Sequence, residues 1–160
     1  KQKFKIGNTS FEVIFIPGHT KGHIAFHFKN EKIIFTGDTL FSLGCGKVFE
    51  GTYEQMFSSL NKLKNLPEDT KIYCGHEYTK KNLEFCLEHD RNNDILKKKH
   101  DWVISQLKSN SPTIPSSIGE EKKTNIFLRC DDPLIKNALN LNNASDQEIF
   151  SKLRDLKDSF

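Results

Sequence analysis

Three polar residues each follow an apolar run, and a glycine precedes each of them. They are His19 in IPGHTKGH, Asp38 in IIFTGDTLF and His76 in IYCGHEYT. The runs are rich in β-branched and aromatic residues, so the pattern predicts three strands that end at one edge of a sheet. Each residue alone is more often an ordinary turn residue. Three in the same arrangement favour one shared site.

Two imidazoles and a carboxylate are typical ligands of divalent metals. Zinc, iron and manganese all accept this donor set, and a carboxylate can bridge two ions. A metal with an open position activates water as a nucleophile. We therefore expect His19, Asp38 and His76 to be metal ligands at the catalytic centre of a hydrolase. His23 lies four residues after His19 with a loop between them, so we expect it to support the site.

The composition limits the classes of protein to consider. With 160 residues, 36% hydrophobic and 28% charged, the chain is long enough for one globular domain, or for one domain with a small appendage. A net charge of +3 suits an anionic small substrate and does not favour nucleic acid. No apolar run approaches the roughly 20 residues of a membrane span. The cysteines lack CxxC spacing and predict reduced thiols in a cytoplasmic protein; they are Cys45, Cys74, Cys86 and Cys130.

The chain changes character near residue 78. Before it, apolar runs predict strands over 11–16, 24–28, 32–36 and 71–74, and the continuous runs 11–16 and 32–36 are typical of strands covered on both faces. A helix is expected from Thr52, with Gln55 completing a capping box, and a glycine-rich loop over 44–51 precedes it.

After residue 78 the apolar spacing becomes helical, and a second capping box pairs Ser145 with Glu148. We expect a β-rich α/β domain over 1–78 and a helical domain over 79–160, with the helix after Thr52 covering one face of the sheet.

Six motifs carry a family resemblance. PGHTKGH, FTGDTLF, GCGKVFEGT, CGHEYTKKNLEF, TIPSSIGEE and NIFLR occur in the order and spacing of the glyoxalase II (hydroxyacylglutathione hydrolase) family. This chain resembles that family, which belongs to the metallo-β-lactamase superfamily, from about residue 11 onward. The first two motifs mark the superfamily. GCGK, GHEYT and FLR resemble the glutathione-thioester branch.

The resemblance implies a fold and an activity. The fold is an αββα sandwich followed by a helical, glutathione-binding domain. The activity is hydrolysis of S-D-lactoylglutathione to D-lactate and glutathione, the second step of methylglyoxal detoxification. A hydroxide between two divalent metals would attack the thioester; zinc is the first expectation, with iron or manganese as alternatives.

The resemblance also assigns roles. It implies that His19 binds the first metal, that His76 binds the second, and that Asp38 bridges them. It places five residues at substrate-binding positions, namely Lys47, Phe49, His76, Tyr78 and Arg129. Phe49 stands where the family often has tyrosine, and Asp132 stands where some members carry a second cation.

The family motif THxHxDH, which supplies four ligands, does not occur in this sequence. We therefore expect the chain to form the C-terminal half of the sandwich plus the helical domain, and to show little activity alone. The apolar faces of 11–16 and 33–35 would lack a partner layer, which favours self-association or binding of the N-terminal segment.

Three alternatives stay open at this point. A persulfide dioxygenase relative would use one iron and consume oxygen with glutathione persulfide. A metallo-β-lactamase would hydrolyse nitrocefin. A non-catalytic remnant would bind glutathione conjugates through Lys47, Tyr78 and Arg129 without metal.

Overall fold

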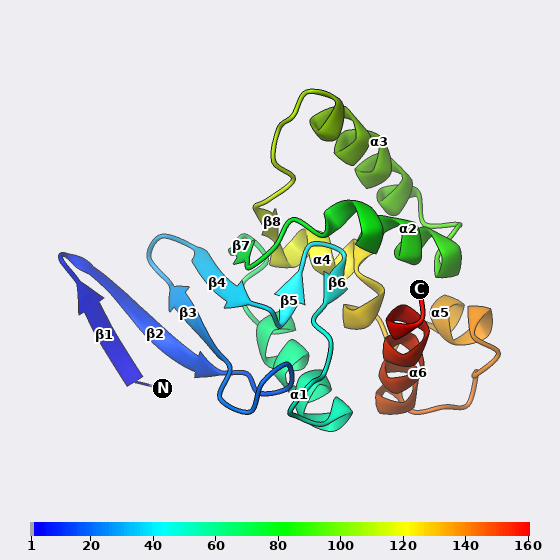
Figure 1. Ribbon diagram of the computed structural model, residues 1–160, viewed down its shortest axis with the longest axis horizontal. Coiled ribbons are helices and arrows are strands. Elements are labelled where there is room, and N and C mark those ends of the chain that lie inside the picture. The colour runs from blue at the N-terminus through cyan, green and yellow to red at the C-terminus, as the bar shows by residue number, and fades with distance from the viewer. Residues whose placement is uncertain (1) are drawn as a thin grey trace.

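The computed structural model describes residues 2–160, so Lys1, the first residue of the expected domain 1–78, lies outside it. Within this range a mixed sheet has the order β1-β2-β3-β4-β7-β8, and β5 and β6 form a separate hairpin (Figure 1). The strands are β1 Gln2–Ile6, β2 Thr9–Phe15, β3 Ile24–Phe28, β4 Ile33–Gly37, β5 Leu40–Phe41, β6 Gly44–Cys45, β7 Lys71–Cys74 and β8 Ser116–Ser117. The helices are α1 Tyr53–Lys64, α2 Thr79–His89, α3 Asp94–Lys108, α4 Ile118–Thr124, α5 Pro133–Ala138 and α6 Asp146–Asp158, with a 3₁₀ turn at Ile126–Leu128.

The sheet brings the ends of β4 and β7 to the same edge. Strands β1 to β4 pair antiparallel, whereas β4 and β7 run parallel and are joined through α1. Gly37 is the register partner of Cys74, and the Gly75 N–H donates to the Gly37 carbonyl at 2.9 Å. The residues after these two strands, Asp38 and His76, are therefore neighbours in space.

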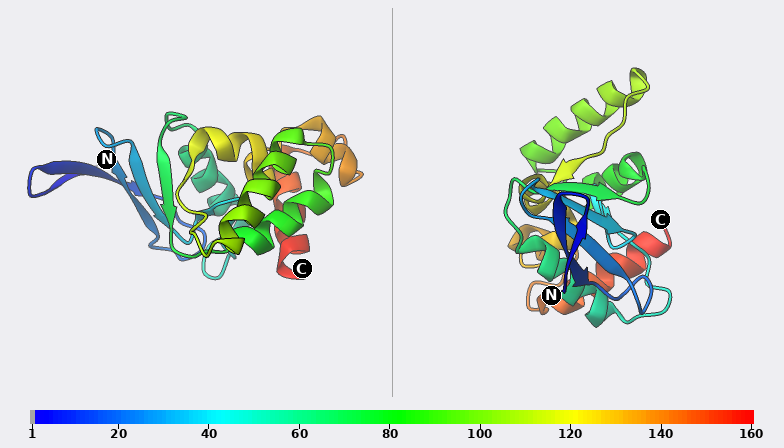
Figure 2. Two further views of the ribbon diagram at one scale, coloured as in Figure 1. Left: turned by 90° about the horizontal axis from the view of Figure 1, so that it is seen from above. Right: turned by 90° about the vertical axis from the view of Figure 1, so that its left-hand side faces the viewer.

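Helix α1 covers one face of the sheet, as its sequence predicts. The capping box between Thr52 and Gln55 starts it. Its buried residues Met56, Leu60 and Leu63 lie at helical spacing and share one core with inward residues of the strands. Those strand residues are Ile14, Ile34 and Ile72. The remaining helices gather on the same side of the sheet (Figure 2).

The opposite face of the sheet is open. Phe15, Phe26 and Phe35 are 54%, 38% and 44% exposed. The Phe35 ring packs against Tyr73 of the adjacent strand, with ring centroids 5.5 Å apart. The prediction that strands 11–16 and 32–36 are covered on both faces is therefore wrong for the described residues, because the helices all lie on one side. The expectation of an exposed apolar face is confirmed.

The C-terminal region is mostly helical, as expected, but it also contributes to the sheet. Strand β8 pairs antiparallel with β7, through Ser116 opposite Ile72 and Ser117 opposite Lys71. The capping box of Ser145 and Glu148 starts α6. The four cysteines are unpaired, as their spacing predicts. Among residues 2–160, no helix has both the length and the apolar character needed to cross a membrane.

A buried acid joins the C-terminal region to the β5–β6 hairpin. The sequence predicted only a glycine-rich loop over 44–51 and no strand in this region. Glu121 of α4 is fully buried. Its carboxylate accepts hydrogen bonds from the Leu43 N–H at 2.8 Å and from Asn125 Nδ2 at 2.9 Å, and it lies in contact with the Ser116 hydroxyl. Burial raises the pKa of Glu121 to about 7, against the opposing effect of these hydrogen bonds.

We predict that the open sheet face makes the chain self-associate. Replacing the cross-strand partners Phe26 and Phe35 by Lys and Glu should move the protein to monomer, because the apolar area is removed and the new charges face each other. Sedimentation velocity checks this, with Ile95→Lys on the distant helix α3 as the control. A wild-type chain that sediments as a monomer and melts cooperatively would contradict the prediction.

We also predict a stability change near neutral pH. The folded-state pKa of Glu121 is raised from 4.5 to about 7, so the folded chain holds this proton more tightly than the unfolded chain. The resulting stabilisation, about 3 kcal/mol, is present below pH 4.5 and is lost as the pH rises toward 7. Glu121→Gln can keep the bonds to Leu43 and Asn125 and donate to Ser116, so urea unfolding of this variant should lack that slope. An equal slope in both proteins would refute the assignment.

Candidate functional site

The three predicted ligands converge at one end of the sheet. The Asp38 carboxylate lies between two imidazoles: Oδ2 is 3.4 Å from His19 Nε2, and Oδ1 is 3.5 Å from His76 Nε2. The side chains of His19, Asp38 and His76 are 19%, 27% and 48% exposed. The group is therefore open to solvent, and each carboxylate oxygen faces one histidine.

Glycines make this close approach possible. Gly37 has φ +52°, and a Cβ there would lie 2.6 Å from His23 Nε2. A Cβ on Gly75 would overlap Asp38 Oδ1, and one on Gly46 would overlap the Asp38 carbonyl. The backbone can approach Asp38 this closely because these positions carry no side chain, and at Gly75 the added atom would displace the Asp38 carboxylate itself.

Hydrogen bonds orient the two histidines nearest Asp38. The His19 ring donates from Nδ1 to the Lys47 carbonyl at 2.8 Å, since a carbonyl can only accept. That bond leaves Nε2 as an acceptor directed toward Asp38. His23 Nε2 accepts from the Asp38 backbone N–H at 3.0 Å, so His23 supports the Asp38 turn, as expected.

The donor set suits two divalent cations only in part. Among residues 2–160, no three His, Cys, Asp or Glu side chains surround a single point that could hold an ion. The geometry instead gives two half-sites, each with one imidazole nitrogen and one carboxylate oxygen. These are ligands that divalent cations accept, but zinc takes four. Each half-site needs further donors.

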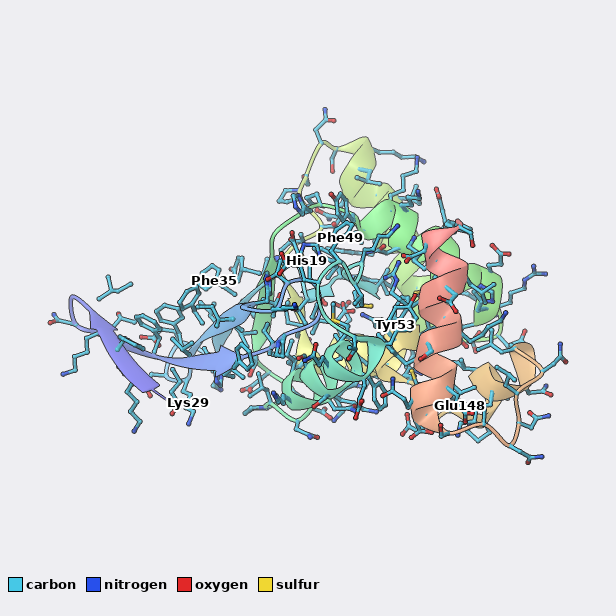
Figure 3. All side chains as sticks on the ribbon, turned by 60° about the horizontal axis from the view of Figure 1, so that its bottom comes forward. His19, Lys29, Phe35, Phe49, Tyr53 and Glu148 are labelled. Atoms are coloured by element: carbon cyan, nitrogen blue, oxygen red, sulfur yellow. The ribbon has the colours of Figure 1, made fainter. Side chains whose placement is uncertain are left out.

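Aromatic rings flank His19 and His76. Tyr78 stacks on His76 with ring centroids 4.8 Å apart, and Phe41 packs against Tyr78 at 5.3 Å. Phe49 contacts the His19 ring at 5.2 Å (Figure 3). Phe49 and Tyr78 are 68% and 51% exposed, so two aromatic surfaces are open to a ligand beside the histidines.

Two lysines lie near the segments that carry the site: Lys47 is bonded to His19 through its carbonyl, and Lys157 contacts α2. The Lys47 side chain is half exposed, and its Nζ is 3.9 Å from Asp158 of α6. Lys157 donates to the Lys81 carbonyl at 3.2 Å, one helical turn after Tyr78. Burial, together with the charges of Lys81 and Arg154, lowers the pKa of Lys157 to about 8. Lys157 Nζ lies over the Phe85 and Phe160 rings, whereas Lys47 is the cation beside His19, where an anionic ligand would compete with Asp158 for it.

Arg154 fixes the loop that carries Lys47. This buried residue of α6 donates to the Cys45 carbonyl at 2.8 Å and to Asp158 at 2.8 Å. The sequence did not lead us to expect a role near the site for Arg154 or Lys157. Their spacing of three residues places them on one face of a helix, which is the signal that was available.

Arg129 lies elsewhere. It forms ion pairs with Asp90, just after α2, and with Asp132, which caps α5. Tyr78 is at the other end of α2, and the 11 residues of that helix span about 16 Å. The structure thus brings His19, Asp38, His76, Lys47, Phe49 and Tyr78 together but not Arg129, whose binding role stays a prediction from the resemblance.

Comparison with known proteins decides the family. The model for the hydroxyacylglutathione hydrolase C-terminus matches residues 77–160, more than half of the chain, and the metallo-beta-lactamase superfamily model matches residues 2–76. The chain belongs to the hydroxyacylglutathione hydrolase family. The two matched regions meet after residue 76, close to the expected boundary at 78, although the division into domains itself stays a prediction.

Two relatives named hydroxyacylglutathione hydrolase illustrate the similarity. One from Pelagibacter ubique (strain HTCC1062) is 56% identical over 153 residues, which are 96% of this chain and 58% of the relative. One from Bartonella tribocorum (strain CIP 105476 / IBS 506) is 45% identical over 159 residues, which are 99% of this chain and 63% of the relative. The chain thus spans about three fifths of the length of these relatives.

Solved structures confirm the predicted fold class. The structure of ETHE1 from Myxococcus xanthus has a TM-score of 0.59 at 23% identity, covering 97% of this chain and 49% of that chain. The BLEG-1 B3 metallo-beta-lactamase has a TM-score of 0.54 at 24% identity, covering 80% and 46%. The chain therefore has the α/β architecture of the metallo-β-lactamase fold, followed by a helical part.

We predict that Gly75→Ala weakens metal binding with little loss of stability. The new Cβ overlaps Asp38 Oδ1, and a carboxylate can rotate away at low cost, but it then no longer faces His76. Zinc affinity should fall at least about tenfold, while the free energy of unfolding changes by about 1 kcal/mol or less.

Zinc titration followed by the histidine ring signals in NMR, with urea unfolding in parallel, measures both quantities. Gly22→Ala is the matched control, because a Cβ there has no atom within 4 Å. Equal zinc affinity in the two alanine variants would contradict the prediction.

Proposed function

We propose that this chain supplies one part of the active site of a hydroxyacylglutathione hydrolase, which hydrolyses S-D-lactoylglutathione to D-lactate and glutathione. The observation that carries the proposal is the Asp38 carboxylate between His19 and His76, with cationic and aromatic side chains beside it. The names of the relatives support the same substrate class.

His19 and His76 would each hold one divalent cation through Nε2, and Asp38 would share one oxygen with each. When bound, the cations supply an activated water and polarise the thioester carbonyl. The bond from His19 to the Lys47 carbonyl keeps that imidazole in the tautomer a metal ligand needs. His23 keeps the Asp38 turn in place through the backbone N–H.

The glutathione part of the substrate carries carboxylates, which the cation beside the site would bind. Lys47 supplies positive charge, and Arg154 positions the loop of Lys47. The Tyr78 hydroxyl and the exposed ring of Phe49 offer contacts to the tripeptide. The thiolate that leaves is a much weaker base than an alkoxide, since a thiol has a pKa of about 8.5. Its departure therefore needs less protonation by a general acid than the departure of an alkoxide.

We propose that donors outside these 160 residues complete the site. Each half-site has two protein donors, and the sequence contains no THxHxDH string. The chain alone should therefore bind metal weakly and hydrolyse little. The identity of the metal, a cytoplasmic location and the lack of a nucleic-acid partner stay predictions.

The test compares the chain alone with a fusion to the region that precedes the matched residues in the Pelagibacter ubique relative. The fusion should contain two metal ions by elemental analysis and should hydrolyse S-D-lactoylglutathione, followed by thioester absorbance. The chain alone should do neither. Metal binding by the fusion without hydrolysis would refute the substrate, and oxygen uptake with glutathione persulfide would identify an iron-dependent dioxygenase.

A binding measurement separates the glutathione site from the metals. Lys47→Ala should weaken binding of S-hexylglutathione to the metal-free fusion several-fold in calorimetry, since a carboxylate contact is lost. Lys98→Ala, an exposed lysine of α3, is the control and should have no effect. Metal-independent binding without any hydrolysis would favour the alternative of a non-catalytic glutathione-conjugate binding protein.

A further inference from the structure

The turn that carries His76 is partly exposed and is held by aromatic contacts and a few hydrogen bonds. Residues 75–78 connect β7 to α2, and the side chains of His76 and Tyr78 are about half exposed. One backbone bond, from the Gly75 N–H to the Gly37 carbonyl at 2.9 Å, ties the start of the turn to the sheet. The Phe41 ring and the Cys74 thiol, which donates to the His76 carbonyl at 3.4 Å, also restrain His76, and the remaining support comes from polar contacts made further along the turn.

Glu77 makes those contacts. Its Oε1 accepts from the Thr113 backbone N–H at 2.8 Å, and its Oε2 accepts from the Thr113 hydroxyl at 2.6 Å. Two hydrogen bonds to one carboxylate are charge-assisted and fix its orientation. The Thr113 hydroxyl gives its one proton to Glu77, so it accepts from the Thr79 hydroxyl at 2.6 Å. Thr79 and Thr113 are each 1% exposed.

We call the two hydrogen bonds between Glu77 and Thr113 the clamp; Glu77 lies in the chain between the stacked residues His76 and Tyr78. His76 and Tyr78 stack on each other with an interplanar angle of 15°, while the side chain between them, Glu77, reaches Thr113. Thr113 belongs to the connection between α3 and β8. The C-terminal region therefore holds the turn 75–78 through two hydrogen bonds to Glu77. Both oxygens of Glu77 are engaged by Thr113, which leaves Glu77 unsuited to be a ligand itself.

We propose that Glu77 is a positioning residue: its clamp on Thr113 holds the His76 ring in the direction a metal needs and the Tyr78 ring in the direction a glutathione conjugate needs. The inference rests on the proposed function for its chemical purpose. The clamp itself is a property of the described residues and can be tested without metal or substrate.

The metal test uses Zn²⁺ alone, added to the isotope-labelled chain and followed by the ring signals of individual histidines. Glu77→Gln keeps the shape but removes the charge that strengthens both bonds, and its amide N–H₂ can face the Thr113 hydroxyl only if that hydroxyl reverses its bond to Thr79. Zinc affinity reported by His76 should fall at least about tenfold, while the response of His19 changes less than about twofold. Thr113→Val should act in the same direction, and Thr113→Ser should restore the response.

Glu68→Gln is the matched control, because Glu68 also joins two segments through its carboxylate, which pairs with Lys122 at 2.6 Å. It should leave both histidine responses unchanged. A parallel fall at His19 and His76 in Glu77→Gln, or a loss in Thr113→Ser as large as in Thr113→Val, would overturn the proposal.

A metal-free measurement keeps the clamp testable if the proposed function fails. Amide hydrogen exchange and ¹⁵N relaxation at residues 76–78 should report a more mobile turn in Glu77→Gln than in wild type, with α1 unchanged. If wild type binds no zinc yet Glu77→Gln loosens the turn, the clamp stands and the metal assignment fails. An equally ordered turn in both proteins would refute the clamp.

Discussion

The approach of two histidines to one carboxylate is the constraint on which the rest of the structure depends. Asp38 can lie between His19 and His76 only if three strand-end turns meet without side chains in the way, which requires glycine at 37, 46 and 75. It also requires β4 and β7 to be parallel neighbours in register, which the α1 crossover provides. The fold and the site are therefore two aspects of the same packing.

Much of this was predictable because it depends on neighbouring residues. Apolar runs predicted the four central strands, both capping boxes predicted helix starts, and strand ends identified His19, Asp38 and His76. The strands β5, β6 and β8 have two residues each, which is too few to leave a periodic pattern in the sequence. They depend on distant partners such as Glu121, which binds Leu43 from 78 positions away.

Two other sequence-based expectations show the limits of reading residues by type. A continuous apolar run predicted strands buried on both faces, yet the same run also fits a strand whose second covering layer is not among the described residues. The resemblance places Arg129 at the substrate, and its ion-pair partners Asp90 and Asp132 could not be read from that motif; its binding role stays a prediction.

The bond from Arg154 to the Cys45 carbonyl links residues 109 positions apart, and its consequence concerns the order of folding. Closing so long a loop costs more entropy than forming contacts between nearby residues, so we expect this bond to form after the local structure. The sheet and α1 can therefore assemble before α6 reaches the Lys47 loop, which also bonds to His19. Local detachment of α6 would remove the support from Arg154 without opening the sheet, so the loop would loosen before the fold is lost.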